Sequence, residues 1–197
     1  MELSREAAFA LLSEYTKSAS LIKHGMGVEA AMLWYANHFG LSEEEQLKWG
    51  IAGLLHDFDY EMYPNSEAPD GHPYKGNEIL KELGYPEDIC TAIMGHALYT
   101  GVARESQMAK TLFAVDELSG LITAAVYVRP DKSIHTLKLK SVKKRFKDKA
   151  FARGCNRDDI KQGAQELGIE LDQHMENVII AMQERADELG LCGDQAA

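Results

Sequence analysis

The stretch IAGLLHDFDY, from Ile51 to Tyr60, places the strongest constraint on how this chain can fold. An apolar run with helical spacing stops at a histidine and two carboxylates, His56, Asp57 and Asp59. Burying such groups costs several kcal/mol unless each is paired, hydrogen-bonded or bound to a metal. An aspartate at a helix C-terminus also opposes the helix dipole. The fold must therefore bring other polar groups or a cation to this helix end.

The rest of the sequence also favours helices. Capping signals and apolar spacing predict helices over residues 4–22, 29–39, 43–57, 74–83, 86–96, 106–127, 156–167 and 171–189, with one or two more in the basic segment before residue 150. No segment shows a convincing strand alternation, and the β-compatible residues 126–128 are too few to build on. We therefore predict an all-α single domain, with a core of residues 1–130 and a C-terminal helical extension, residues 131–197, that packs on it.

Length and cysteine usage indicate a cytoplasmic protein. A chain of 197 residues can bury one sizeable core, and no apolar run approaches the roughly 20 residues that cross a bilayer. The charged N-terminal segment lacks the hydrophobic region of a signal peptide. Cys90, Cys155 and Cys192 are widely spaced and form no CxxC pair. We expect reduced thiols, no membrane contact and no thiolate zinc site.

The charge distribution excludes one class of partner and leaves another open. A net charge of −10 argues against binding to a nucleic acid polymer, because contacts with phosphates dominate that affinity. Between Lys138 and Lys149, however, the chain carries seven basic residues and one acid. This basic segment can be a solvated helix face, a surface for an acidic partner, or a rim that binds an anionic substrate through Lys143 and Lys144.

Six side chains are candidate ligands of a metal centre: His24, His56, Asp57, His72, His96 and Asp116. The four histidines are expected at or near helix ends, from which side chains can converge inside a bundle and leave an opening to solvent. Imidazoles and carboxylates without a thiolate suit divalent Mn, Fe, Co, Ni or Zn. Two such ions roughly 3.5–4 Å apart polarise a phosphoryl oxygen and generate a hydroxide near neutral pH.

The remaining three histidines are not expected to take part. His38 lies near a predicted helix end, and His174 is expected on a polar face of the last helix. His135 also lies outside the pattern of the six candidates.

The order His…His-Asp…Asp resembles the signature of the HD-domain superfamily of metal-dependent phosphohydrolases, whose fold is a helical bundle. The segment GHPYKGNEILKELGYPEDICTAIMGHA is similar to the superfamily's HDIG-like, two-metal branch: histidine, short helix, Gly-Tyr-Pro-Glu, helix, histidine. Phe58 and Asp59 replace the last two residues of the HDIG tag. The stretch LLHDFDYE instead resembles a small set of uncharacterised predicted HD hydrolases. The superfamily resemblance covers about residues 20–125.

The resemblance implies how the candidate ligands divide between two metals. His24, His56, Asp57 and Asp116 would hold one ion, whereas His72 and His96 would complete a second site with Asp57 as the bridge. Asp116, in AVDELSGLI, matches the family's closing aspartate. The implied activity is hydrolysis of a small phosphate ester or nucleotide by a metal-activated hydroxide. The implied cofactors are two divalent ions, from among Mn, Fe, Co, Ni, Zn and Mg.

Two cations are candidates to neutralise the phosphoryl group and, with Asp57, to act in catalysis. Lys75 follows His72 by three residues and so lies on nearly the same helical face. Arg129 directly precedes Pro130, whose turn can aim it inward. Both are also compatible with solvated side chains. Asp59 can orient a ligand histidine, shuttle a proton or cap the next turn.

Two other functions are compatible with the same residues. Mixed-valent di-iron oxygenases resemble HD proteins and use the same six ligand types to cleave a C–C or C–P bond with oxygen. A non-catalytic, ligand-sensing HD module is the second alternative, although loss of ligands would mark such a module and this chain retains all six. The expected partner is a small phosphorylated metabolite or nucleotide. The C-terminal extension can cap the site or form the interface of a homodimer.

Overall fold

The computed structural model describes residues 3–66 and 68–193, which form helices and the connections between them. The helices are α1 (Arg5–Tyr15), α2 (Ala19–His38), α3 (Glu43–Leu55), α4 (Tyr74–Glu82), α5 (Glu87–His96), the 3-10 helix η1 (Leu98–Thr100), α6 (Gln107–Tyr127), α7 (Leu139–Lys147), α8 (Arg157–Leu167), α9 (Leu171–Glu184) and α10 (Ala186–Leu189). Within the described residues, β-structure is limited to one isolated bridge, between Ser133 and Cys192. The prediction of an all-α fold is confirmed.

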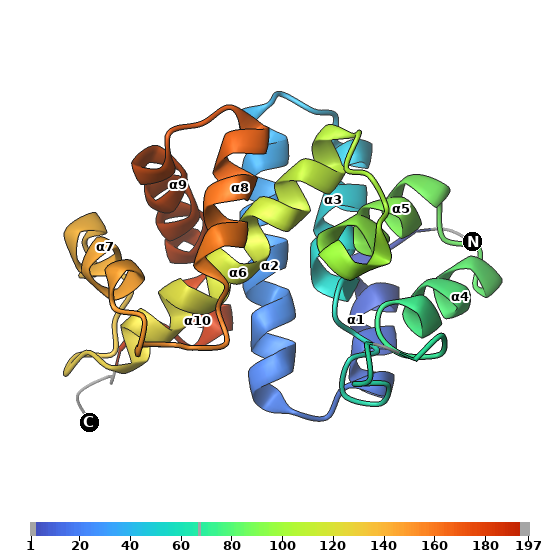
Figure 1. Cartoon of the computed structure of the whole chain (residues 1–197), viewed down its shortest axis with the longest axis horizontal. Helices are drawn as coiled ribbons and strands as arrows, with labels where there is room; N and C mark the ends of the chain where they lie inside the picture. Colours follow the sequence, from blue (N-terminus) through green and yellow to red (C-terminus); the bar gives the residue numbers. More distant parts are fainter. Residues whose placement is uncertain (1–2, 67, 194–197) are drawn as a thin grey trace.

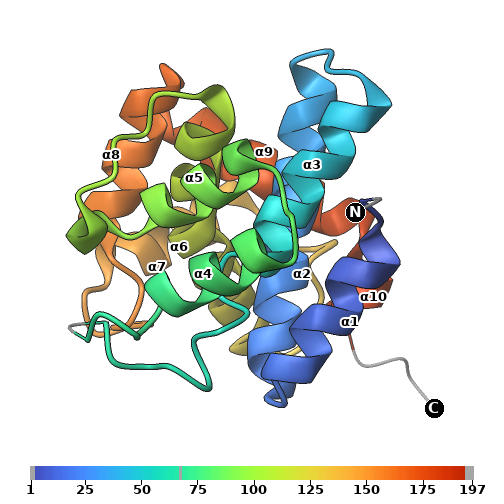
Figure 2. The ribbon, with the colours of Figure 1, turned by 90° about the vertical axis from the view of Figure 1, so that its right-hand side faces the viewer.

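The long helices α2 and α6 cross at the centre of the molecule. Helices α1, α3, α4 and α5 lie on one side of this pair, and α7, α8 and α9 lie on the other (Figure 1). Helix α2 packs against α3, α6 and α9, whereas α6 packs against α5 and α8. Figure 2 shows α4 and α5 side by side in front of α6. The predicted core and extension therefore contact each other through α2 and α6; their outermost residues, 1–2 and 194–197, lie outside the described residues.

The first two predicted helices have different boundaries in the structure. Instead of helices over 4–22 and 29–39, α1 ends at Tyr15 and α2 runs without interruption from Ala19 to His38. The break follows from a tertiary contact, because Thr16 is extended and its hydroxyl donates to the carbonyl oxygen of Phe58 at 2.8 Å. The prediction that a helix ends before His24 is therefore wrong, because His24 lies in the second turn of α2.

Gly25 lets α2 and α3 approach closely. A Cβ atom at this position would lie 2.9 Å from the carbonyl oxygen of Leu54, a distance that real Cβ atoms essentially never show. Since Leu54 is in the last turn of α3, the close contact brings the end of α3 against the start of α2. His24 therefore lies beside the residues that follow α3.

Other predicted boundaries change less. The last predicted helix, 171–189, is divided into α9 and α10 at Arg185, whose guanidinium pairs with the buried carboxylate of Glu29 at 3.1 Å. The three residues with possible β character belong to the end of α6 and its C-cap, Val128. No helix among the described residues combines the length and the apolar character needed to cross a membrane.

His174 is buried in the core, so the prediction that it lies on a polar face is wrong. Its Nε2 donates to the carbonyl oxygen of Ala114 at 2.8 Å, and its Nδ1 accepts from the hydroxyl of Tyr35 at 2.7 Å. The imidazole thus links α9 to α6 and α2 and is held in its neutral form. Burial lowers the pKa of His174 to about 4.

This buried histidine predicts a loss of stability in mild acid. Between the unfolded pKa of about 6.5 and the folded pKa of about 4, the unfolded chain binds more protons, so the free energy of unfolding falls as pH falls. We expect His174 alone to contribute a decrease of about 2 kcal/mol between about pH 7 and about pH 5, measured by urea unfolding as the difference between the unmodified protein and His174→Gln. His38→Gln, at an exposed position, should show the same pH dependence as the unmodified protein. Equal slopes in both variants would contradict the assignment.

Candidate metal centre

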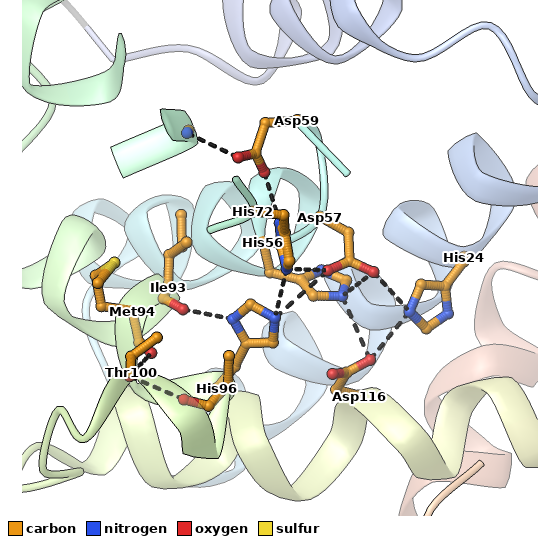
Figure 3. A network of polar contacts seen from close by, with 12 residues as sticks. His24, His56, Asp57, Asp59, His72, Ile93, Met94, His96, Thr100 and Asp116 are labelled. Carbon is orange, nitrogen blue, oxygen red and sulfur yellow. Dashed lines mark hydrogen bonds and ion pairs between the residues drawn. The ribbon is translucent and has the colours of Figure 1, made fainter. Parts of the chain in front are cut away.

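The six candidate ligands meet at one place between α2, α3, α5 and α6 (Figure 3). His24 comes from the second turn of α2 and Asp116 from the middle of α6, whereas His96 ends α5. His56 is the C-cap of α3, so the chain can turn directly after it and direct Asp57 to the same centre. His72 reaches the centre from the connection that precedes α4. Residues separated by up to 92 positions therefore contact one another.

The carboxylate of Asp57 separates the other ligands into two groups. Its Oδ2 lies 3.5 Å from His56 Nε2 and 3.9 Å from His24 Nε2. Its Oδ1 lies 3.2 Å from His72 Nε2 and 3.4 Å from His96 Nε2. Asp116 Oδ1 joins the first group, at 3.0 Å from His24 Nε2 and 3.3 Å from His56 Nε2.

The spacing within each group is suited to a shared cation. In the group of His24, His56 and Asp57, and again in that of Asp57, His72 and His96, the ligand atoms all lie within 4.8 Å of one another. Ligands that bind one ion at about 2.0–2.2 Å cannot lie more than about 4.4 Å apart, so small side-chain adjustments are enough for coordination.

Hydrogen bonds at Nδ1 direct three of the imidazoles. His56 Nδ1 donates to the carbonyl oxygen of Gly53 at 2.8 Å, and His96 Nδ1 donates to that of Ile93. His72 Nδ1 hydrogen-bonds Oδ1 of Asp59 at 2.7 Å. Because carbonyl and carboxylate oxygens accept these protons, each imidazole in its neutral form directs the lone pair of Nε2 toward the centre.

The surroundings of His56 show whether a cation fits this site. Its side chain is 0% exposed, and its Nε2 has no hydrogen-bond partner among the described residues. Buried polar atoms are nearly always satisfied, so an unpartnered nitrogen that faces two carboxylates indicates a missing positive charge. Four imidazole nitrogens and two carboxylates are ordinary ligands of borderline divalent ions. The residues present therefore fit a metal centre.

The charges around the imidazoles also favour a bound cation. Burial alone would lower the pKa of His56, but the charges of Asp57 and Asp116 raise it well above its usual value. Burial would likewise lower the pKa of His72, but its hydrogen bonds to Asp57 and Asp59 raise it to about 9. Burial opposes ionisation of Asp57 and Asp116, yet the charge of His56 holds the pKa of both carboxyls well below the usual range. The site thus stabilises positive charge between its carboxylates.

A comparison with models of protein families matches the HD domain to residues 21–121, slightly more than half of the chain. The chain belongs to the HD-domain family. The matched range contains all six converging residues, and the predicted relation to the HD-domain superfamily is confirmed. HD domains are typical of metal-dependent hydrolases. No curated protein and no solved structure matches the chain.

A cavity of about 600 Å³ opens from the centre of the HD domain. Beside the ligands, its wall contains Ala97, Leu98, Tyr99 and Tyr60 from one side, and Gly154, Cys155, Asn156 and Asp159 from the C-terminal extension. Residues beyond 131 therefore build part of the cavity wall, in agreement with one of the two roles considered for this extension, that of covering the site.

Glu117 is a further acid in the cavity wall that was not among the predicted site residues. It directly follows Asp116, and this adjacent pair of acids was the one signal in the sequence that could have found it. Burial, reinforced by the charge of Asp116, raises the pKa of Glu117 to about 7.

The cations predicted to bind substrate are elsewhere. Lys75 donates to Glu78 at 2.8 Å, and Arg129 makes two bonds to Asp131, both at 3.0 Å. Lys143 pairs with Asp172, and Lys144 is exposed on α7. None of the four is among the described residues that line the cavity. Their roles in catalysis and substrate binding stay predictions.

Asp59 has one of the three roles considered for it, the orientation of a ligand histidine, and it also caps a helix further along the chain. It is 1% exposed, and while Oδ1 bonds His72, Oδ2 accepts from the backbone N–H of Gly76 at 2.7 Å in the first turn of α4. A Cβ atom at Gly76 would lie 2.6 Å from Cγ of Asp59, so only glycine allows this contact. The carboxylate thus caps α4 and orients His72 at once.

Asp59→Ala should weaken metal binding at one group only. The change removes the acceptor that holds the imidazole of His72, and loss of such a partner typically lowers metal affinity by about 10–100-fold. We expect this decrease for the ion held by His72 and His96, with little change for the ion at His24 and His56. Metal titrations monitored by calorimetry would separate the two. Asp70→Ala, at an exposed position in the same connection, is the control; equal weakening at both groups would contradict this role.

Proposed function

We propose that this HD-domain protein hydrolyses the phosphate ester bond of a small phosphorylated metabolite or nucleotide, with two divalent cations as cofactors. The observation that carries the proposal is the carboxylate of Asp57, whose two oxygens face two separate groups of imidazoles. His24, His56 and Asp116 would complete one site, and His72 and His96 the other. Two bound ions would polarise a phosphoryl oxygen and lower the pKa of the attacking water.

The protein's own contribution would be to hold the ligands and to shape the space for the ester. Three of the imidazoles are held by Nδ1 hydrogen bonds, so little conformational freedom remains to be lost when a cation binds. The hydroxyl of Tyr99 donates to the carbonyl oxygen of His72 at 2.9 Å and keeps the aromatic wall against the centre. Tyr60 and Leu98 would contact the organic part of the substrate.

Cavity size and charge support a small substrate and a requirement for metal. A volume of about 600 Å³ is within the usual range of small-molecule sites, about 300–1,000 Å³. No lysine or arginine is among the described residues of the wall, so the positive charge for a phosphoryl group would come from bound cations. Lys75 and Arg129 would contribute only after leaving Glu78 and Asp131.

Metal analysis combined with a phosphate-release screen tests the proposal. We expect about two divalent ions per chain, and release of phosphate from one or more phosphorylated metabolites that stops on chelation and returns with added metal. The screen should compare Mn, Fe, Co, Ni, Zn and Mg. Iron content with oxygen consumption and no phosphate release would instead support an oxygenase. Tight nucleotide binding without any product would support a sensing module.

A further inference from the structure

A second and larger cavity adjoins the one at the metal centre. It has a volume of about 790 Å³ and shares Gly154, Cys155 and Asn156 with the first cavity. Its lining comes from the end of α7, the connection that follows and the first turns of α8; Figure 1 shows this connection in orange. Five cationic side chains line it: Lys147, Lys149, Arg153, Arg157 and Lys161. We name it the basic cavity.

Three of these cations are available to a ligand. Lys147, Lys149 and Arg153 are exposed, and within residues 3–66 and 68–193 none of them makes a hydrogen bond or an ion pair. The other two have structural partners. Lys161 pairs with Asp158 at 2.7 Å, and Asp158 is the one acid among the described lining residues.

Arg157 holds the loop that carries the free cations. Its guanidinium donates to the carbonyl oxygens of Ala152, Cys155 and Phe151, and more weakly to that of Asp148. Four carbonyl groups of one loop are therefore gathered around a single cation. The loop backbone between α7 and α8 is thereby fixed next to the shared wall, with Lys149 and Arg153 on it.

The two cavities have opposite charge. The cavity at the metal centre contains the carboxylates of Asp57, Asp116, Glu117 and Asp159 and, among described residues, no lysine or arginine. The basic cavity has an excess of cations beyond the wall formed by Gly154, Cys155 and Asn156. An anion would therefore be attracted to the basic cavity even in metal-free protein, whereas an anion at the carboxylates requires bound cations.

We infer that the basic cavity binds a second anionic group of the substrate, so that the substrate carries two phosphate groups, or a phosphate and a carboxylate. This inference rests on the proposed function, in which the scissile phosphate lies at the metals. Lys147, Lys149 and Arg153 bind the second anionic group. The shared wall contacts the part of the substrate that joins this group to the scissile phosphate. The cations come from the end of the basic segment and the loop after it, and not from Lys143 and Lys144.

Binding of inorganic pyrophosphate to metal-free protein tests the basic cavity without any catalysis. We expect saturable binding by calorimetry that weakens as salt is raised. The double variant Lys147→Glu/Lys149→Glu should weaken it by about tenfold or more, because both cations become repulsive. The matched control Lys138→Glu/Lys140→Glu changes net charge equally at exposed positions outside the cavity and should change affinity less than about twofold. Equal loss in both variants, or no binding to the unmodified protein, would overturn the inference.

Kinetics of the metal-loaded enzyme test whether the ligand is the substrate. Alkanediol bisphosphates of increasing chain length would be compared with alkyl monophosphates of the same length. We expect at least one bisphosphate to be preferred, and Lys147→Glu/Lys149→Glu to lower kcat/KM about tenfold for it but not for its monophosphate. An equal decrease in kcat/KM for the bisphosphate and the monophosphate would overturn the inference that the basic cavity binds the substrate. Pyrophosphate binding without phosphate release from any ester would overturn the proposed function and this substrate role, while the anion-binding cavity would stand.

Discussion

Asp57→Ala is expected to lose both metal ions and to lower turnover by more than about 10³-fold, or about 4 kcal/mol in the activation free energy. The two oxygens of Asp57 face different pairs of imidazoles, so no other single side chain serves both groups. Without it, His72 and His96 keep no carboxylate at the centre, and His24 and His56 keep only Asp116. Metal content after dialysis and phosphate release under metal-saturating conditions would measure the two losses.

The fold should survive this change. Asp57 lies at the wall of a cavity with its side chain 24% exposed, outside the apolar core. Circular dichroism and thermal unfolding of metal-free Asp57→Ala should therefore resemble those of the metal-free unmodified protein. Asp70→Ala, which removes an exposed carboxylate from the following connection, should keep both ions and full turnover. If Asp57→Ala kept one ion and substantial turnover, Asp57 would not be the bridge.

His96→Ala is expected to retain one ion and to lower turnover by about 100- to 1,000-fold. It leaves a single imidazole, His72, beside Oδ1 of Asp57, whereas the group of His24, His56 and Asp116 is untouched. One ion would still bind, but without its partner to share the charge of the phosphoryl group. Elemental analysis of the purified variant gives the stoichiometry, and phosphate release gives the rate.

The reciprocal variant makes this prediction specific. His24→Ala should also retain one ion, now at His72 and His96. The unmodified protein would then bind two ions, His96→Ala and His24→Ala one ion each, and Asp57→Ala none. Full turnover in His96→Ala would show that a single metal is enough. Loss of both ions in His96→Ala would show that the two groups do not bind independently.

Helix boundaries could be predicted where the signal is local. Ser42 and Ser106 accept hydrogen bonds from the first turns of α3 and α6, and Gly168 takes the left-handed conformation that ends α8, with φ of 68°. The break after α1 could not be predicted, because Thr16 bonds Phe58, which is 42 residues away. The burial of His174 could not be predicted for the same reason, because its partners Tyr35 and Ala114 belong to helices far away in the sequence.

The substrate side of the site was less predictable than the ligands. Lys75 was predicted from its spacing to His72 and Arg129 from the turn at Pro130, but each has an acid within three residues that binds it instead. The walls of both cavities depend on the loop around Gly154, more than 30 residues beyond Asp116 along the chain. No spacing rule connects such segments.

The amino-acid sequence by itself determined the all-helical class and the donor set of four imidazoles and two carboxylates, because periodicity, capping and side-chain chemistry are properties of short segments. Only the tertiary structure decided that those donors converge and that the two oxygens of Asp57 divide them into two groups. It also decided that an acidic and a basic cavity share a wall. Distances between residues far apart in the chain depend on how helices pack, and packing is decided by the whole core at once.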